Sequence, residues 1–337
     1  MRVLFASLAS VGHTYPLIPL AIAAREAGHD VRFAAGEHVH PPLLRNGLRP
    51  FRPADSFYEI YAEDLEPELA RLRPDLVVHE WGLPGAAVAA ERAGIPGLWH
   101  GFGRMIPEGI GLQRPTPAGG APDRPHLDIC PPSLQDKDFL ATAERVELRP
   151  VPYSEPSPHV ERTTRPLIYL TLGTAFGTPE ILTAAIEGLA PLGAQIVVAT
   201  GRVRPEELGA VPDNVTVRAW ISQAELVPHV DAVVHHGGSG TTLGALAAGV
   251  PQLVLPQGAD QFANAEALVA AGAALSLQPG ELGAEAIAEH ARSLLPHHGN
   301  TGHRDAALVI AGEIARMPSP AEVARDLPGL VRVVRST

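Results

Sequence analysis

Short apolar runs alternate with longer segments whose apolar residues recur at helical spacing. The expected strands of the first half are Val3 to Leu8, Asp30 to Ala34, Leu76 to Val78 and Gly97 to His100. The expected helices are Pro16 to Ala27, Pro41 to Asn46, Leu65 to Leu72 and Gly85 to Ala93. Strands that alternate with amphipathic helices predict an α/β fold with a parallel, doubly wound sheet.

The second half repeats this scheme. Its expected strands are Leu167 to Leu172, Ala194 to Ala199, Val215 to Ala219, Ala232 to His235 and Gln252 to Leu255. Its expected helices are Pro179 to Leu189, Glu225 to Pro228, Gly240 to Ala248, Phe262 to Ala271 and Gly283 to Leu295. Because 337 residues are many for one core, we predict domains over 1–153 and 167–317, a proline-rich linker over 154–166 and a terminal segment over 318–337.

A glycine-rich turn joins an expected strand to an expected helix in the second half. It reads His235-His236-Gly237-Gly238-Ser239-Gly240-Thr241. Backbone N–H groups and the helix dipole attract phosphate at such a helix N-terminus, and glycine lets a ligand approach the backbone. The turn therefore favours a diphosphate site, with an ordinary tight turn as the alternative.

The turn and the segment after it together resemble a known family. The segment Ala248 to Ala265, which contains Asp260 and Gln261, is similar to the nucleotide-sugar motif of family 1 glycosyltransferases. The match is closest to actinomycete enzymes that decorate polyketides and enediynes, including those of the calicheamicin type. The resemblance implies the GT-B fold, with two facing Rossmann-like domains that have parallel sheets and a terminal segment that crosses back to the first domain.

The same resemblance assigns roles to the donor side of the C-terminal domain. In the family, residues at the positions of Asp260 and Gln261 hydrogen-bond the donor sugar, and His235 aligns with a histidine that contacts phosphate, whereas His236 is expected to pack. Further donor-site candidates follow other strands of this domain: Gly173, Thr174, Trp220, Ile221 and Gln223. The family stacks the nucleobase on an aromatic residue at Trp220, which contributes about 1–3 kcal/mol in nucleic-acid systems; a core tryptophan is the alternative.

The catalytic candidates lie in the N-terminal domain. His13 follows the first strand at its carboxyl end, where doubly wound sheets bind ligands, and Gly12 beside it leaves room. Imidazole titrates near neutral pH and suits a general base, which is the role of this histidine in the family; a helix-capping histidine is the alternative. Glu80 occupies the position at which the family has the carboxylate partner of this histidine, which is often an aspartate. Because glutamate is one methylene longer, its reach to His13 is less certain from the sequence. Asp75 precedes that strand and is expected at the opposite end of the sheet.

The acceptor side is less well specified. Trp81, His100 and Phe102 lie at or after strand ends and are candidates for an apolar acceptor pocket, together with Gly12, although the core would also accommodate them. The chain is short for the family, with compressed segments near 53–59, 112–123 and 154–159. The two explanations are a trimmed variant and a numbering that closes over further loop residues, and we favour the second. These regions usually shape the acceptor pocket in relatives.

Composition narrows the choice of partners. A net charge of −11 without a basic run disfavours nucleic acid and anionic membranes, and no apolar stretch is long enough to span a bilayer. The start of the chain is unlike a secretory signal, and the single cysteine, Cys130, fits a cytoplasmic protein. Asp136-Lys137-Asp138 matches a metal-binding pattern of another glycosyltransferase fold, but a three-residue pattern is common by chance. We expect neither a metal nor a cofactor.

The sequence thus predicts an inverting, metal-independent transferase of the hexosyltransferase type. It would move a deoxysugar from a nucleoside diphosphate, thymidine by resemblance, to a hydroxyl of a polyketide or enediyne-type aglycone. Its partners would be these two small molecules, and a homodimer is left open. The alternatives are a nucleotide-sugar epimerase of GT-B fold and a non-catalytic nucleotide-sugar-binding partner protein. His13 and Glu80 argue against the non-catalytic alternative.

Overall fold

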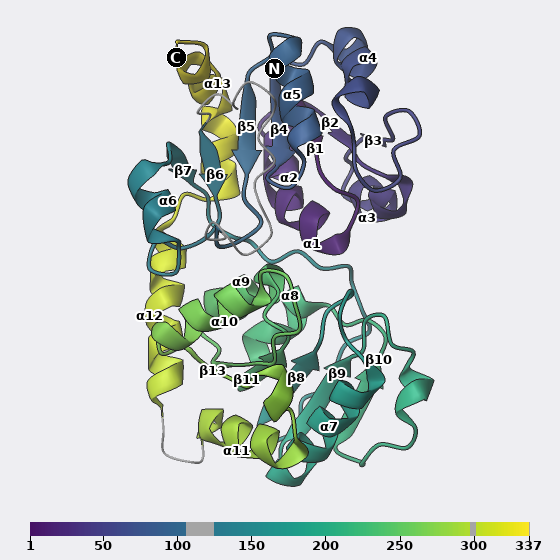
Figure 1. Ribbon diagram of the computed structural model, residues 1–337, viewed down its shortest axis with the longest axis vertical. Coiled ribbons are helices and arrows are strands. Elements are labelled where there is room, and N and C mark those ends of the chain that lie inside the picture. The colour runs from purple at the N-terminus through teal and green to yellow at the C-terminus, as the bar shows by residue number, and fades with distance from the viewer. Residues whose placement is uncertain (106–124, 297–300, 337) are drawn as a thin grey trace. The chain divides into compact units, whose positions relative to one another are not determined.

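The computed structural model describes residues 1–105, 125–296 and 301–336, so the compressed segment at 112–123 lies outside the described residues. The chain divides into two compact units (Figure 1). The first unit contains Met1–Tyr153 and Arg316–Thr337, and the second unit contains Ser154–Ala315. Each unit is built on a parallel sheet with helices against its faces.

The first unit has strand order β3-β2-β1-β4-β5-β6-β7, and all neighbouring strands are parallel. The strands are β1 Arg2–Ala6, β2 Asp30–Ala34, β3 Pro50–Phe51, β4 Leu76–Glu80, β5 Gly97–His100, β6 His126–Asp128 and β7 Arg145–Glu147. The helices are α1 Val11–Thr14, α2 Ile18–Glu26, α3 His40–Arg45, α4 Ala62–Leu72, α5 Pro84–Arg92, α6 Lys137–Thr142 and α13 Pro320–Ser336.

The second unit has strand order β10-β9-β8-β11-β12-β13, again parallel throughout. The strands are β8 Leu167–Thr171, β9 Gln195–Ala199, β10 Val215–Arg218, β11 Ala232–His235, β12 Gln252–Val254 and β13 Ala274–Ser276. The helices are α7 Pro179–Leu189, α8 Gln223–Leu226, α9 Ser239–Ala247, α10 Gln261–Ala270, α11 Ala284–Leu294 and α12 Gly302–Arg316. Short 3₁₀ turns complete both units at 15–17, 37–39, 190–192, 205–208, 227–229 and 279–281.

Both sheets reverse their direction of growth at the same place. β4 returns to lie beside β1, and β11 returns to lie beside β8. In doubly wound sheets a crevice forms outside the carboxyl ends of the strands at this reversal, and ligands bind there. The fold therefore directs attention to the loops after β1, β4, β8 and β11.

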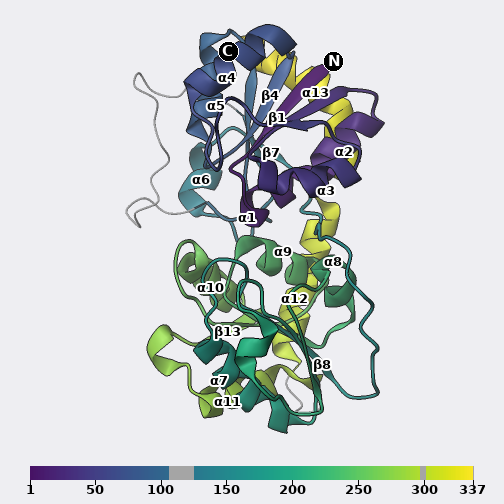
Figure 2. The same cartoon turned by 90° about the vertical axis from the view of Figure 1, so that its right-hand side faces the viewer.

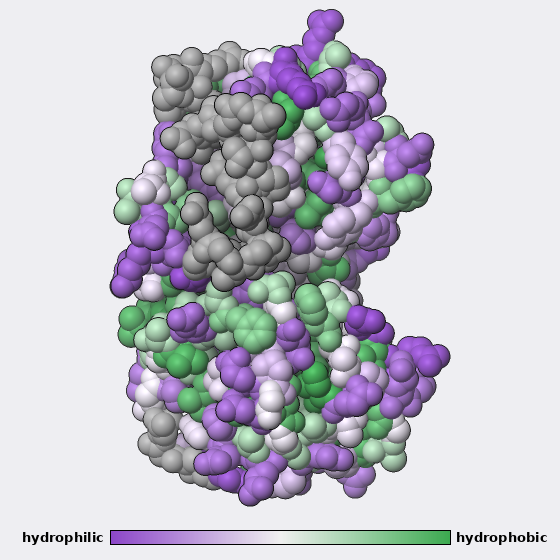
Figure 3. Space-filling view, viewed as in Figure 1, coloured by the Kyte–Doolittle hydropathy of each residue, from purple (hydrophilic) through white to green (hydrophobic). Residues whose placement is uncertain are grey.

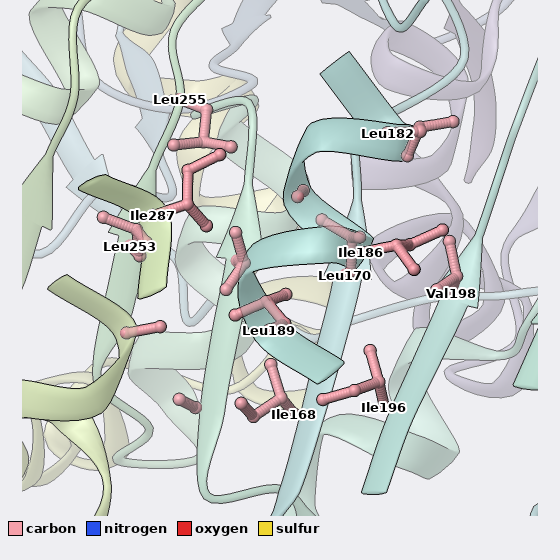
Figure 4. Packing of buried hydrophobic residues seen from close by; sticks show 14 of the residues in the cluster. Ile168, Leu170, Leu182, Ile186, Leu189, Ile196, Val198, Leu253, Leu255 and Ile287 are labelled. Atoms are coloured by element: carbon pink, nitrogen blue, oxygen red, sulfur yellow. The ribbon is translucent and has the colours of Figure 1, made fainter. Parts of the chain in front are cut away.

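The sheet of the second unit is buried on both faces, which explains why its strands are nearly continuous apolar runs. Ile168 and Leu170 of β8 pack with α7 and α11 in one cluster (Figure 4). Leu167 and Tyr169, which alternate with them, pack in a second cluster on the other face. Burying an aliphatic side chain of this size contributes about 1.5–3 kcal/mol, so these clusters fix the strand register.

The end of the chain belongs to the first unit. Helix α13 packs beside α2 (Figure 2), and the His29 ring nitrogen Nε2 lies 3.0 Å from the carbonyl oxygen of Ala324. The Arg149 backbone N–H donates to the Pro318 carbonyl at 2.8 Å. Within the described part of the chain, no helix is both long and apolar enough to cross a membrane.

The predicted α/β class with two parallel sheets is confirmed, and each expected strand and helix is found within a few residues of its predicted bounds. The sequence did not predict β3, β6, β7 and β13. β6 carries His126 and Asp128, which are buried although polar, so it lacks the apolar run that marks the other strands. β7 is half-buried throughout and includes two charged residues.

Helix α7 approaches α11 so closely that Gly188 has no room for a side chain. A Cβ atom at Gly188 would lie 2.3 Å from the Ala284 carbonyl oxygen. We expect Gly188→Ala to lower the free energy of unfolding, because overpacking costs about 1–3 kcal/mol and alanine regains only about 0.5–1 kcal/mol in a helix. Gly280→Ala is the control, since nothing lies within 4 Å of its Cβ position. Equal denaturant midpoints for both variants would contradict this packing.

Candidate functional site

The reversal point of the first sheet brings His13 and Glu80 together. β1 and β4 are neighbours with Ala6 opposite His79, so α1 after β1 lies beside the end of β4. The His13 Nδ1 and Glu80 Oε1 atoms are 2.9 Å apart. The carboxylate is fully buried, whereas 28% of the His13 side chain is exposed. A carboxylate oxygen at Nδ1 can accept the proton on that nitrogen, and in this tautomer the basic lone pair of the ring is on Nε2.

Gly82 completes the support of Glu80, and sequence reasoning missed it. The Gly82 N–H donates to Glu80 Oε1 at 2.8 Å. A Cβ atom at Gly82 would lie 3.1 Å from both carboxylate oxygens, so any larger residue would press on Glu80. The extra methylene of glutamate is therefore accommodated. Asp75 binds the Arg2 N–H at the opposite end of the sheet, as expected.

Of the acceptor candidates, Phe102 and Trp81 lie near His13, whereas His100 is buried. The Phe102 ring lies 5.3 Å from the His13 ring and 5.8 Å from the Trp81 ring. Nothing lies within 4 Å of a Cβ position at Gly12, which leaves open space beside His13. His100 is fully buried, its Nδ1 donates to the Gly101 carbonyl at 2.6 Å, and burial lowers its pKa to about 4. His100 is therefore a neutral interior residue and not available to an acceptor, contrary to the prediction.

Asp128 braces the segment that carries Phe102. Its buried carboxylate accepts from the Cys130 N–H and from Gln135 Nε2, and burial raises its pKa to about 6. Gln135 Oε1 in turn accepts from the Met105 N–H at 2.8 Å. This relay ties the segment after β5 to β6. No sequence motif marked it, because its members are far apart in the chain.

Asp136 acts as a helix cap. Its Oδ1 accepts from the N–H groups of Asp138 and Phe139 at 3.1 Å, at the start of α6. No group of three or more histidine, cysteine, aspartate or glutamate side chains that could hold a metal occurs among the described residues.

The reversal point of the second sheet gathers the glycine-rich loops. Thr171 at the end of β8 lies opposite His235 at the end of β11. The His236 ring packs between Gly173 and Gly238, where added Cβ atoms would lie 2.6 Å and 2.5 Å from ring atoms. Both glycines are therefore needed to admit this ring, and Gly173 also has a φ of +71°.

The two turn histidines differ in how the fold uses them. His235 is fully buried, its Nδ1 accepts the Gly237 N–H at 3.1 Å, and its Nε2 donates to Gln252 Oε1 at 2.8 Å. Both ring nitrogens are thus used inside the fold, and burial lowers the pKa of His235 to about 3. His235 is not available for the phosphate contact assigned to it. His236 lies between the two glycine loops instead, and burial lowers its pKa to about 4, which keeps it neutral at pH 7.

Asp260 ties the turn to the next loop. Its Oδ2 accepts from Ser239 Oγ and from Asn264 Nδ2, both at 2.9 Å. Asn264 Nδ2 also donates to the Gly237 carbonyl at 2.9 Å. Gln261 Oε1 accepts the N–H groups of Gln257 and Gly258. The sequence did not reveal Asn264, although it lies one helical turn after Asp260.

The remaining donor candidates flank this turn. Trp220 is half-buried and its Nε1 donates to the Glu155 carbonyl at 3.1 Å. Thr241 Oγ1 donates to Gln223 Oε1 at 3.0 Å, which links α9 to α8. Thr174 and Gly240 are exposed, whereas only 2% of Ile221 is, so the Ile221 side chain belongs to the core rather than to a ligand site.

Comparison with known proteins places this arrangement among sugar transferases. Residues 183–330 match the family model described as Erythromycin biosynthesis protein CIII-like, C-terminal domain. The chain is 34% identical to L-demethylnoviosyl transferase of Streptomyces niveus, over 97% of each protein. That alignment spans 382 positions, more than the 337 residues of this chain, so the relative carries internal segments that this chain lacks.

Solved structures agree. The glycosyltransferase SnogD from Streptomyces nogalater is 29% identical, with a TM-score of 0.79 over 98% of this chain and 99% of that chain. Spinosyn rhamnosyltransferase SpnG complexed with thymidine diphosphate is 25% identical, with a TM-score of 0.84 over 97% of this chain and all of that chain. SpnG is also known complexed with the spinosyn aglycone.

The placement of His235 predicts a structural defect for His235→Ala. The variant leaves the buried Gly237 N–H and Gln252 without partners, and each such group costs about 1–3 kcal/mol. We therefore expect a clear loss in the free energy of unfolding, measured by chemical denaturation. The control is His229→Ala, at an exposed histidine of the same unit. Wild-type stability of His235→Ala would show that its two hydrogen bonds do not support the turn.

Proposed function

We propose a specific reaction for this chain, which belongs to the family of actinomycete antibiotic glycosyltransferases with the GT-B fold. It transfers a deoxysugar from thymidine diphosphate to a hydroxyl group of a polyketide or enediyne-type natural product, with inversion at the anomeric carbon. The first unit binds the acceptor and the second unit binds the donor. The observation that carries the proposal is the 2.9 Å contact between an accessible imidazole, His13, and a buried carboxylate, Glu80.

His13 acts as the general base. Its Nε2 takes the proton of the acceptor hydroxyl while that oxygen attacks the anomeric carbon, and the bond from this carbon to the diphosphate oxygen breaks. The electron pair of the broken bond leaves with the diphosphate. Glu80 holds the ring through Nδ1 and stabilises the imidazolium that forms, which is the role of a carboxylate behind a catalytic histidine. A single displacement of this kind inverts the anomeric centre.

The second unit supplies the donor site in this proposal. The loop at Gly173 and the turn from Gly238 to Thr241 present backbone N–H groups and the α9 N-terminus to the diphosphate, whereas the Gly237 N–H is bound to His235. The neutral His236 ring packs between the loops, where its hydrogen bond to the Thr171 backbone orients it. Trp220 stacks on the base, and Asp260 with Gln261 faces the sugar. The thymidine diphosphate bound to SpnG supports the choice of base.

The base assignment predicts the behaviour of His13→Ala. Turnover should fall by roughly 10²- to 10⁴-fold, because proton transfer loses its acceptor, while thymidine diphosphate binds as before. Glu80→Gln should cost less, since the imidazole remains. Turnover is measured by mass spectrometry of products from a panel of thymidine and uridine diphosphate sugars with polyketide aglycones.

Asp75→Asn is the matched control, because Asp75 is a carboxylate at the opposite end of the same sheet and should leave turnover unchanged. Unchanged turnover in His13→Ala would remove His13 from the mechanism. An isomerised donor in reactions without an acceptor would instead favour the epimerase.

The donor site also predicts independence from divalent metal ions. N–H groups and a helix N-terminus neutralise the departing diphosphate, so we expect the rate to persist in EDTA. Activity that is lost in EDTA and restored by manganese would contradict this charge balance.

A further inference from the structure

Phe176 sits on the loop after β8, against the loop after β12 that we propose for sugar binding. It lies between β8 and α7, and 42% of it is exposed. A Cβ atom at Gly258 would lie 3.0–3.4 Å from three atoms of the Phe176 ring, so the ring covers the backbone two residues before Asp260. The surface seen in Figure 3 mixes hydrophobic and hydrophilic side chains, so exposure alone would not single out Phe176. Its contact with Gly258 does.

The polar groups of this loop are largely used inside the protein. Asp260 Oδ2 holds Ser239 and Asn264, which leaves Oδ1 as the carboxylate oxygen free of these two bonds. Gln261 is 2% exposed, and its Oε1 already accepts two backbone N–H groups. A fully hydroxylated hexose needs a partner for each hydroxyl that it buries. Where Phe176 covers the loop after β12, a sugar would meet an aromatic ring, which offers no hydrogen-bond partner to a hydroxyl group.

The loop shape is also constrained. Ala259, between Gly258 and Asp260, has a φ of +54°, in the left-handed region that is unfavourable for a residue with a Cβ atom. The bonds from Gln261 Oε1 to the N–H groups of Gln257 and Gly258 hold this turn. The loop is therefore held in one shape rather than free to turn further polar groups toward a hydroxyl.

We infer that Phe176 is a specificity-determining residue that selects donor sugars lacking a hydroxyl at the ring position it covers. This inference rests on the proposed function, because it takes Asp260 and Gln261 as the sugar-binding residues. The aromatic ring packs against a deoxygenated carbon, whereas a hydroxyl at that carbon loses its water without gaining a partner. An apolar pocket rejects an added hydroxyl by roughly 10- to 100-fold.

Matched donors test the inference. Calorimetry gives the dissociation constants of three thymidine diphosphate (TDP) sugars without an acceptor: TDP-glucose, TDP-6-deoxyglucose and TDP-2-deoxyglucose. Once an acceptor is found, kcat/KM is measured for the same three donors. In the wild type, we expect one deoxy donor to be preferred over TDP-glucose by roughly 10- to 100-fold. In Phe176→Ala, the dissociation constants of the deoxy donor and of TDP-glucose should differ by no more than a fewfold. Phe176→Tyr, which adds a hydroxyl to the ring, should shift the preference toward TDP-glucose.

Val269→Ala is the control, at a 45% exposed apolar residue on α10 in the same unit, and should keep the wild-type preference. If the donors bind and the preference is the same in wild type and Phe176→Ala, Phe176 does not select the sugar and the inference fails, while the proposed transfer stands. If the wild type binds no donor, the proposed function fails as well. Equal wild-type affinity for all three donors also overturns the inference.

Discussion

The reversal of strand order in each parallel sheet is the constraint on which both sites depend. Because every strand runs in the same direction, all loops after the strands emerge at one edge, and the reversal places two such loops side by side. In the first unit this brings His13 to Glu80, which are 67 residues apart in sequence. In the second unit it brings Gly173 to His236 and Gly238. Neither pairing is local in sequence, so each depends on the sheet being formed.

Burial then separates residues with the same chemistry into different roles. His235 and His236 are adjacent, yet His235 uses both ring nitrogens inside the fold and His236 lies between two glycine loops. Glu80 is buried behind an accessible imidazole, where a carboxylate orients the ring. Asp128 is buried where it braces a loop. The same side-chain type thus serves a proposed reaction or the fold according to its burial and its hydrogen-bond partners.

Sequence reasoning predicted the elements with strong apolar periodicity and placed His13 and Glu80 at the carboxyl ends of neighbouring strands, whereas the roles that it gave to these residues and to Asp260 and Gln261 stay predictions. It assigned a phosphate contact to His235, whose two ring nitrogens are used inside the fold, since adjacency in sequence does not show which of the two rings turns inward. Gly82, Gln252 and Asn264 were missed because their importance lies in what they touch: a buried carboxylate, a buried imidazole and a turn carbonyl. Phe176 was missed because its packing on Gly258 joins two loops far apart in sequence.

The central claim is that the loops around His236 hold the diphosphate of the donor. Calorimetric titration with thymidine, thymidine monophosphate and thymidine diphosphate tests it most directly, in the wild type and in Gly173→Ala, whose Cβ would press on the His236 ring. We expect the diphosphate to bind at least about tenfold more tightly than thymidine, because charge-assisted hydrogen bonds to its phosphate oxygens supply that free energy. Gly173→Ala should lose this gain and keep its affinity for thymidine. Equal affinity of the wild type for thymidine and thymidine diphosphate would contradict the claim.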